Sequence, residues 1–170
     1  RDRVLGHAFF SDQSQIALRM LTHDDAPVDE AFWGGRLDAA LRFRESLAID
    51  GTAWRLVHGE ADLLPSIVVD RYGDVLVVQT LSQGSDAMLP LLTRLLVERT
   101  GATGVVERND PRVRQLEGLE SRVGVIHGEV PDYVPVQLNG IEYEVDVRDG
   151  QKTGLFLDQR ENHLAAAGYA

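Results

Sequence analysis

The chain has 170 residues, of which 44% are hydrophobic, and a formal net charge of −10 at pH 7. The lack of cysteine excludes disulfides, thiolate metal sites and a cysteine nucleophile within these residues. No apolar run is long enough to span a membrane, and the charged residues 1–5 do not lead into the apolar segment of a secretory signal. The expected location is the cytoplasm. The acidic balance argues against extensive phosphate binding, because domains that bind nucleic acid usually carry a basic surface.

Two short strands are predicted at the start of the chain, over residues 7–10 and 16–21. A turn over residues 24–27, which ends in Pro27, separates them from a helix. The helix is predicted over residues 28–50, because apolar positions recur there at helical spacing with arginines and acids on the opposite face.

Strand and helix signals are densest between residues 52 and 148. Strands are predicted over residues 54–57, 64–70, 75–79, 104–107, 122–127, 134–138 and 141–147. Helices are predicted over residues 86–100 and 112–119. The second and third strands meet at a hairpin turn, and Asn139-Gly140 is a strong type I′ hairpin signal between the last two strands. The pattern predicts an α+β fold, with a mixed or antiparallel central sheet and helices on one face.

The segment of residues 150–162, with the sequence GQKTGLFLDQREN, gathers amide, ammonium, hydroxyl, carboxylate and guanidinium groups within thirteen residues and includes the only lysine, Lys152. One interpretation is a solvated hairpin that leads into a helix capped by Asp158, with Glu161 three residues on as in a capping box. The alternative is the wall of a pocket, because an apolar strand over residues 155–157 would lie between polar groups. Composition alone favours the hairpin.

A His-Gly-Glu sequence occurs twice, at residues 58–60 and 127–129, each time after a predicted strand. Two His and two Glu side chains could form a metal site. The preferred interpretation is a strand end that turns at glycine, and no metal is expected.

Arg108, Arg112 and Arg114 form the most concentrated basic cluster in the chain. One interpretation is contact with an RNA backbone. The preferred interpretation is a solvated helix face, since surface charge runs usually have no further role. The neighbouring carboxylates that would balance its charge are Glu107, Asp110 and Glu117.

The segment GQKTGLFLDQREN resembles the signature of the ribosomal RNA large-subunit methyltransferase I family, S-adenosylmethionine-dependent enzymes that methylate cytosine C5 in large-subunit rRNA. The resemblance extends upstream through RLVHGEADLLPSIVVDRYGDVLVVQ (55–79), VVERNDPRVRQLEGL (105–119) and residues 12–19. It implies a parent protein with an N-terminal PUA-like RNA-binding domain, a central α+β domain and a C-terminal Rossmann-like methyltransferase domain.

The same resemblance implies a division of this chain. Residues 1–22 are then the last strands of the PUA-like domain, and residues 23–51 a linker helix. Residues 52–148 are the central domain, and residues 149–170 a hairpin and the start of the methyltransferase domain.

By resemblance, the segment of residues 150–162 lies at the mouth of the methyltransferase pocket. Its first three side chains would donate to phosphates or base edges, its aromatic ring would pack near the cofactor or target base, and its last three would orient cofactor or substrate. The expected cofactor-binding or substrate-orienting residues are Gln151, Lys152, Thr153, Phe156, Asp158, Gln159 and Arg160.

The catalytic steps of the family are expected elsewhere. The family uses a cysteine thiolate that adds to C6 of the base and a glycine-rich strand-to-helix turn that holds S-adenosylmethionine. This chain has no cysteine and no such turn, so catalysis and most of the cofactor site are expected after Ala170, and the chain alone is expected to be inactive.

Two functions are therefore considered. The first is a fragment of an rRNA methyltransferase, with 23S rRNA as partner, that shapes access of the substrate to the catalytic domain. The alternative is a stand-alone, non-catalytic RNA-binding or adaptor module. No membrane association is expected, and the oligomeric state is open, with a homodimer as one candidate.

Overall fold

A computed structural model describes residues 3–169, which form a five-stranded central sheet and two two-stranded sheets. The central strands are β3 (Ala53–His58), β4 (Ile67–Tyr72), β5 (Val75–Thr80), β6 (Gly104–Asn109) and β7 (Arg122–Gly128). They are ordered β3-β4-β5-β6-β7, with β5 and β6 parallel and the other neighbours antiparallel. The predicted α+β class with a mixed central sheet is confirmed.

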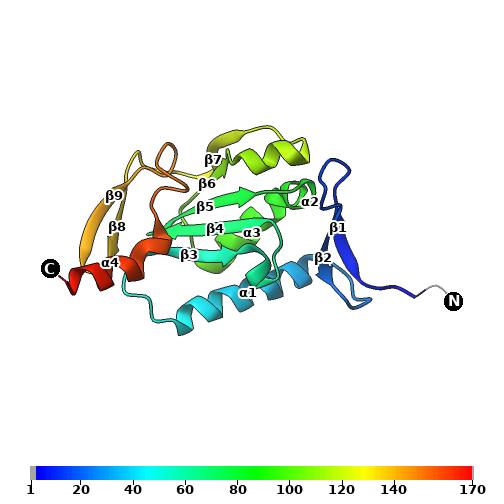
Figure 1. Ribbon diagram of the computed structural model, residues 1–170, viewed down its shortest axis with the longest axis horizontal. Coiled ribbons are helices and arrows are strands. Elements are labelled where there is room, and N and C mark those ends of the chain that lie inside the picture. The colour runs from blue at the N-terminus through cyan, green and yellow to red at the C-terminus, as the bar shows by residue number, and fades with distance from the viewer. Residues whose placement is uncertain (1–2, 170) are drawn as a thin grey trace.

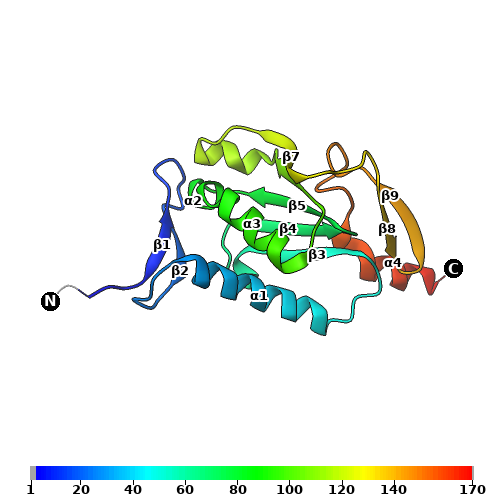
Figure 2. The ribbon, with the colours of Figure 1, turned by 180° about the vertical axis from the view of Figure 1, so that it is seen from behind.

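Two helices cover one face of the central sheet, as predicted (Figures 1 and 2). They are α1 (Glu30–Ser46) and α3 (Leu89–Thr100). Trp33 of α1 and Leu92 of α3 are buried in one cluster with Leu76 of β5. Each fully buried side chain of this size contributes about 1.5–3 kcal/mol, so this layer is a main source of stability.

The helix predicted over residues 86–100 is in fact two helices. A short helix α2 (Gln83–Ala87) begins after Ser82, whose side chain forms a capping box with Ser85. Pro90 then occupies the first turn of α3, where a missing N–H is tolerated. The predicted end of α3 at Gly101 is confirmed, since this residue caps the helix in the left-handed conformation.

A hairpin packs against one end of the opposite face of the central sheet (Figure 1). It consists of β8 (Val134–Leu138) and β9 (Ile141–Val145). The turn residues Asn139 and Gly140 have φ values of 52° and 76°, as a type I′ turn requires, so this prediction is confirmed. Val134 and Val145 pack on Val77 and Val106 of the sheet in a second buried cluster.

The predicted strands near the N-terminus are also present, as β1 (His7–Phe10) and β2 (Leu18–Thr22). They pair antiparallel in a small sheet beside the start of α1 (Figure 1). Phe9 stacks on Trp33 with ring centroids 5.6 Å apart, which joins this sheet to the main core. The division of the chain into domains at residues 22, 51 and 148 stays a prediction.

The remaining elements are short. Three 3₁₀ helices, η1 (Gly59–Asp62), η2 (Arg112–Glu117) and η3 (Leu157–Gln159), precede the last helix, α4 (Arg160–Ala167). The helix predicted over residues 112–119 is thus a shorter 3₁₀ helix, which ends at Gly118 with φ +67°.

No helix within residues 3–169 is long and apolar enough to cross a membrane. In the same range, no three His, Asp or Glu side chains gather where they could hold a metal ion. The two His-Gly-Glu sequences therefore do not combine into the four-ligand site considered above.

Candidate functional site

The segment of residues 150–162 leaves β9 and folds against the central sheet, close to β3 and β4. It does not contain the strand expected over residues 155–157. Leu155 and Leu157 instead pack individually against the second buried cluster, while the intervening Phe156 is 44% exposed. The segment therefore begins with a tight turn bridged between Gln151 and Gly154 and continues through η3 into α4, with Leu155 and Leu157 on its buried side.

Thr153, expected as a donor to phosphate or a base, is buried. Its hydroxyl donates to Asp70 Oδ2 at 2.6 Å and lies 2.9 Å from the hydroxyl of Tyr72. Asp70 is fully buried and also accepts two hydrogen bonds from Arg55, at 2.8 and 2.9 Å. The expected ligand-binding role of Thr153 is wrong in this geometry, because its hydroxyl faces the sheet.

Asp70, Tyr72 and Arg55 were not identified from the sequence. One signal was available: Asp70 ends the apolar run Ile67-Val68-Val69, and a carboxylate on a buried strand requires a partner. Only the fold could supply that partner, since Thr153 is 83 residues away in the chain.

Lys152 and Asp158 are exposed and paired with one another. The ammonium group donates to both carboxylate oxygens, at 2.9 and 3.0 Å, and lies 4.5 Å from the centroid of the Phe156 ring. This hydrogen bond holds the pKa of Asp158 below its ordinary value. Asp158 therefore does not cap α4, and the capping-box interpretation is wrong: the residue before the helix is Gln159, which makes no side-chain cap.

The other predicted residues of the segment lie at its surface or in local contacts. Gln151 is exposed. Gln159 accepts a hydrogen bond from Asn162 at 2.8 Å. Arg160 donates to Glu161 at 2.6 Å. These contacts are between neighbours in sequence, so a ligand can replace them without disturbing the core.

A pocket of about 690 Å³ lies between α1, β3 and the end of the segment. Its lining is mostly apolar and includes Phe43, Trp54 and Leu157, together with the polar side chains of Asp158 and Arg160. The structure thus brings two of the predicted site residues to the edge of a cavity large enough for a small ligand.

Arg108 and Arg114 are not part of a solvated helix face, so the preferred interpretation of the basic cluster is wrong for these two residues. Arg108 is 5% exposed and Arg114 is 1% exposed, whereas Arg112 is exposed. The guanidinium of Arg108 donates to the carbonyl oxygens of Val147 and Gly150, at 3.3 and 3.1 Å, and pairs with Asp110.

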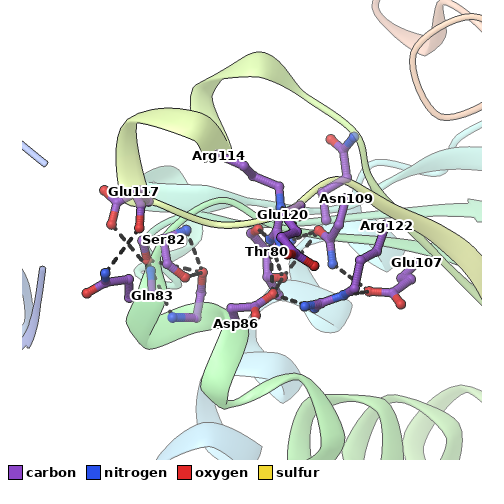
Figure 3. Close-up of polar contacts among 12 residues, drawn as sticks. Thr80, Ser82, Gln83, Asp86, Glu107, Asn109, Arg114, Glu117, Glu120 and Arg122 are labelled. Carbon is purple, nitrogen blue, oxygen red and sulfur yellow. Dashed lines mark hydrogen bonds and ion pairs between the residues drawn. The ribbon is translucent and has the colours of Figure 1, made fainter. Parts of the chain in front are cut away.

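Arg114 lies at the centre of a buried polar network at the ends of β5 and β6 (Figure 3). It donates to the carbonyl oxygens of Thr80 and Glu120, and to Asp86 at 2.9 Å. Four of its five N–H hydrogens are engaged in this way, and the side chain is buried, so it does not reach the surface where a phosphate could bind. Of the three arginines, only Arg112 retains the surface position that RNA contact requires.

The glycine-rich phosphate-binding turn of a Rossmann-like cofactor site is not formed by the described residues. The crossover from β5 to β6 begins at α2, where the carboxylate of Glu117 accepts from the backbone N–H of Gln83 at 3.3 Å. A Cβ added at Gly84 would lie 2.3 Å from the ring of Phe9, so this glycine serves packing. Residues 3–169 therefore do not by themselves fit S-adenosylmethionine in the manner of that turn.

Solved structures with a similar fold are ones whose descriptions name a methyltransferase. A chain described as a SAM-dependent methyltransferase from Streptococcus mutans matches with a TM-score of 0.77 and 22% identity, over 93% of this chain and 41% of its own. A methyltransferase complexed with SAH matches with a TM-score of 0.78 and 22% identity, over 93% of this chain and 40% of its own. The fold is thus one that occurs as part of methyltransferase chains.

Sequence relatives specify the family. The chain is 43% identical over 169 residues to Ribosomal RNA large subunit methyltransferase I of Aliivibrio fischeri (strain MJ11), covering 97% of this chain and 43% of that protein. It is 41% identical over 175 residues to the protein of the same name from Tolumonas auensis, covering 100% of this chain and 44% of that protein. No family model matches the chain.

The chain is therefore homologous, over nearly its whole length, to the ribosomal RNA large subunit methyltransferase I family, and the resemblance identified from the sequence is confirmed. It spans less than half the length of these curated relatives.

Proposed function

We propose that these residues are the substrate-guiding region of an S-adenosylmethionine-dependent rRNA methyltransferase that acts on cytosine C5 of 23S rRNA. The observation that carries the proposal is the placement of the segment 150–162. The stretch that most resembles the family signature contributes Asp158 and Arg160 to the lining of the pocket of about 690 Å³, and Lys152 is paired with Asp158. The names of the relatives support the reaction and the class of substrate.

The ion pair of Lys152 with Asp158 can open so that each side chain binds a ligand instead of the other. Both side chains are about half exposed, at 43% and 61%. An exposed ion pair contributes little to stability, so exchanging it for a phosphate or a base edge costs little. Phe156, 4.5 Å from the ammonium, adds an aromatic face on which a base can stack.

The proposed cofactor is S-adenosylmethionine, with most of its site outside these residues. When bound, it supplies the methyl group. The residues 150–162 would contribute only an edge to that site, through Gln151, Gln159 and Arg160. The proposed partner is rRNA, and the cytoplasmic location and the homodimer stay predictions.

The test compares the complete protein encoded by the gene with the chain described here. Each is incubated with labelled S-adenosylmethionine and large-subunit rRNA lacking the modification, and the methylated base is identified by mass spectrometry. We expect 5-methylcytosine with the complete protein and no transfer with the chain alone. Specific rRNA binding by both, without methyl transfer by either, would favour the non-catalytic RNA-binding or adaptor module.

A further inference from the structure

Two buried anchors fix the segment of residues 150–162 to the central sheet, three residues apart. The first is Arg108 of β6, whose two terminal nitrogens each donate to the carbonyl oxygen of Gly150 at 3.1 Å. The second is the hydroxyl of Thr153, which reaches Asp70 and Tyr72 of β4. The anchors come from different strands and hold different atoms of the segment, so together they restrict both its position and its orientation.

In the second anchor, the donor and the acceptor of each hydrogen bond are determined. Asp70 accepts from Arg55, and Thr153 donates its only hydrogen to the same carboxylate. Tyr72 must therefore donate to Thr153, which leaves the Tyr72 oxygen free to accept from the backbone N–H of Leu155 at 3.1 Å. Burial raises the pKa of Tyr72 to about 12, so the phenol keeps the proton that this chain of hydrogen bonds needs.

Between the anchors, Lys152 has a φ of +55°, in the left-handed region that few residues other than glycine adopt. A non-glycine residue persists there only where its surroundings fix the backbone. Gly154, two residues further on, is itself packed closely against the hairpin, since a Cβ on it would lie 2.6 Å from the side chain of Val145. The anchors thus hold Lys152 in a conformation that directs its side chain over Phe156 and onto Asp158.

We propose that Arg108, Asp70, Tyr72 and Thr153 are positioning residues. They fix the backbone of residues 150–155, so that the exposed groups of Lys152, Phe156 and Asp158 meet the substrate in a single arrangement. The inference rests on the proposed function, because it takes those exposed groups as the ones that orient the substrate. It assigns a role to four buried side chains that do not face the ligand.

The activity test uses Thr153→Val in the complete protein, with Thr153→Ser as the matched control. Valine has the shape of threonine without its hydroxyl, whereas serine keeps the hydroxyl. We expect Thr153→Val to lower kcat and kcat/KM together, by about tenfold to a hundredfold, with KM little changed. Thr153→Ser should restore most of the turnover. A purely structural role would instead scale activity with the folded fraction, which a melting curve of each preparation measures.

A second measurement does not depend on activity. In the chain described here, the side-chain carboxyl of Asp158 is titrated by carbon-13 NMR. The wild-type midpoint should lie below the ordinary range, because Lys152 is held against it. Thr153→Val should raise the midpoint toward the ordinary value, and Thr153→Ser should not. Tyr72→Phe keeps the ring and removes the hydroxyl, so it repeats the test if the valine variant does not fold.

If Thr153→Val or Tyr72→Phe folds and leaves both the Asp158 midpoint and turnover unchanged, the positioning role is wrong. If the complete wild-type protein transfers no methyl group, the proposed function fails instead, and the Asp158 titration still decides whether the anchors fix the segment.

Discussion

Lys152 and Asp158 carry opposite charges at the surface and touch no other charged group of the described residues within hydrogen-bond distance. Their removal should affect function far more than folding. We expect Lys152→Ala and Asp158→Asn in the complete protein to leave the free energy of unfolding almost unchanged. Turnover should fall roughly a hundredfold, as for a misplaced orienting group. Melting temperature and methyl incorporation are measured on the same preparations.

The two effects are separable in this pair because neither side chain belongs to a buried cluster. An early melt of both variants, with activity lost only in proportion to the unfolded fraction, would mean that the segment is a structural loop. Glu142→Gln, at an exposed position of β9 outside the pocket that Asp158 lines, serves as a control that should alter neither quantity.

Arg114 and Arg112 are two residues apart and should respond differently to truncation. Arg114→Ala leaves the carbonyl oxygens of Thr80 and Glu120 without their donor and removes a partner of Asp86. We expect it to lower the free energy of unfolding by about 3–5 kcal/mol, as for one member of a buried ion pair. Arg112→Ala, at an exposed position, should change it by no more than about 0.5 kcal/mol. Urea denaturation of both variants gives the comparison.

At this scale, the sequence indicates which residue types matter but not which way each one faces. Lys152, Phe156 and Asp158 are exposed, as an orienting role requires, yet Thr153 beside them points inward. Adjacent residues of an irregular loop follow no period, so alternation or helical spacing cannot separate them. The inward direction of Thr153 depends on Asp70, which only the tertiary fold brings near.

At the scale of secondary-structure elements, the carboxylate of Asp86 in α2 connects three other elements through hydrogen bonds. It accepts from Arg114 of η2 and Arg122 of β7, and from Thr80 of β5 at 2.9 Å. Burial acts to raise the pKa of Asp86, but these hydrogen bonds outweigh burial and hold the pKa below its ordinary value.

Stability should therefore depend on pH through Asp86. A folded-state pKa below the unfolded value of about 3.9 means that the carboxylate stabilises the fold above that value, and that this contribution is lost as pH falls through the folded pKa. We expect thermal stability to decline below about pH 4, and Asp86→Asn to be less stable at neutral pH with a shallower decline in acid. A parallel decline in wild type and variant would mean that other carboxyl groups dominate.

The regular elements were largely predictable, because local signals determine them. Asn139-Gly140 specified its hairpin, and Gly101 the end of its helix. The break between α2 and α3 was missed although Pro90 marks it, because the apolar spacing runs on through the break. The path of the loop after β9 could not be predicted from local signals alone. The carboxylate of Asp146 accepts hydrogen bonds from the backbone N–H groups of Arg148 and Asp149, which turns the chain. Arg108, which is distant in sequence, then donates to the carbonyl oxygen of Gly150.

Across the whole molecule, both the net negative charge and the pairing of the arginines argue against strong binding of phosphate groups. The net charge is −10, and many of the arginines are engaged with carboxylates, as with Arg44 and Asp62, or buried, as with Arg114. Few cations of the described residues are left to neutralise phosphates. The described residues by themselves should therefore have little affinity for RNA.

We accordingly expect the chain to bind an rRNA oligonucleotide weakly, with a dissociation constant above about 1 μM at physiological salt, in the range of non-specific binding. Fluorescence anisotropy over a series of salt concentrations measures both affinity and its slope. If the side chain of Arg112 touches a phosphate, Arg112→Ala should reduce the slope of the logarithm of the binding constant against the logarithm of the salt concentration by about one. Arg108 and Arg114 are buried and cannot be tested in this way, because truncating them disturbs the core. Tight binding at about 0.2 M salt by a correctly folded chain would contradict the prediction, since only a basic surface or specific base contacts sustain affinity there.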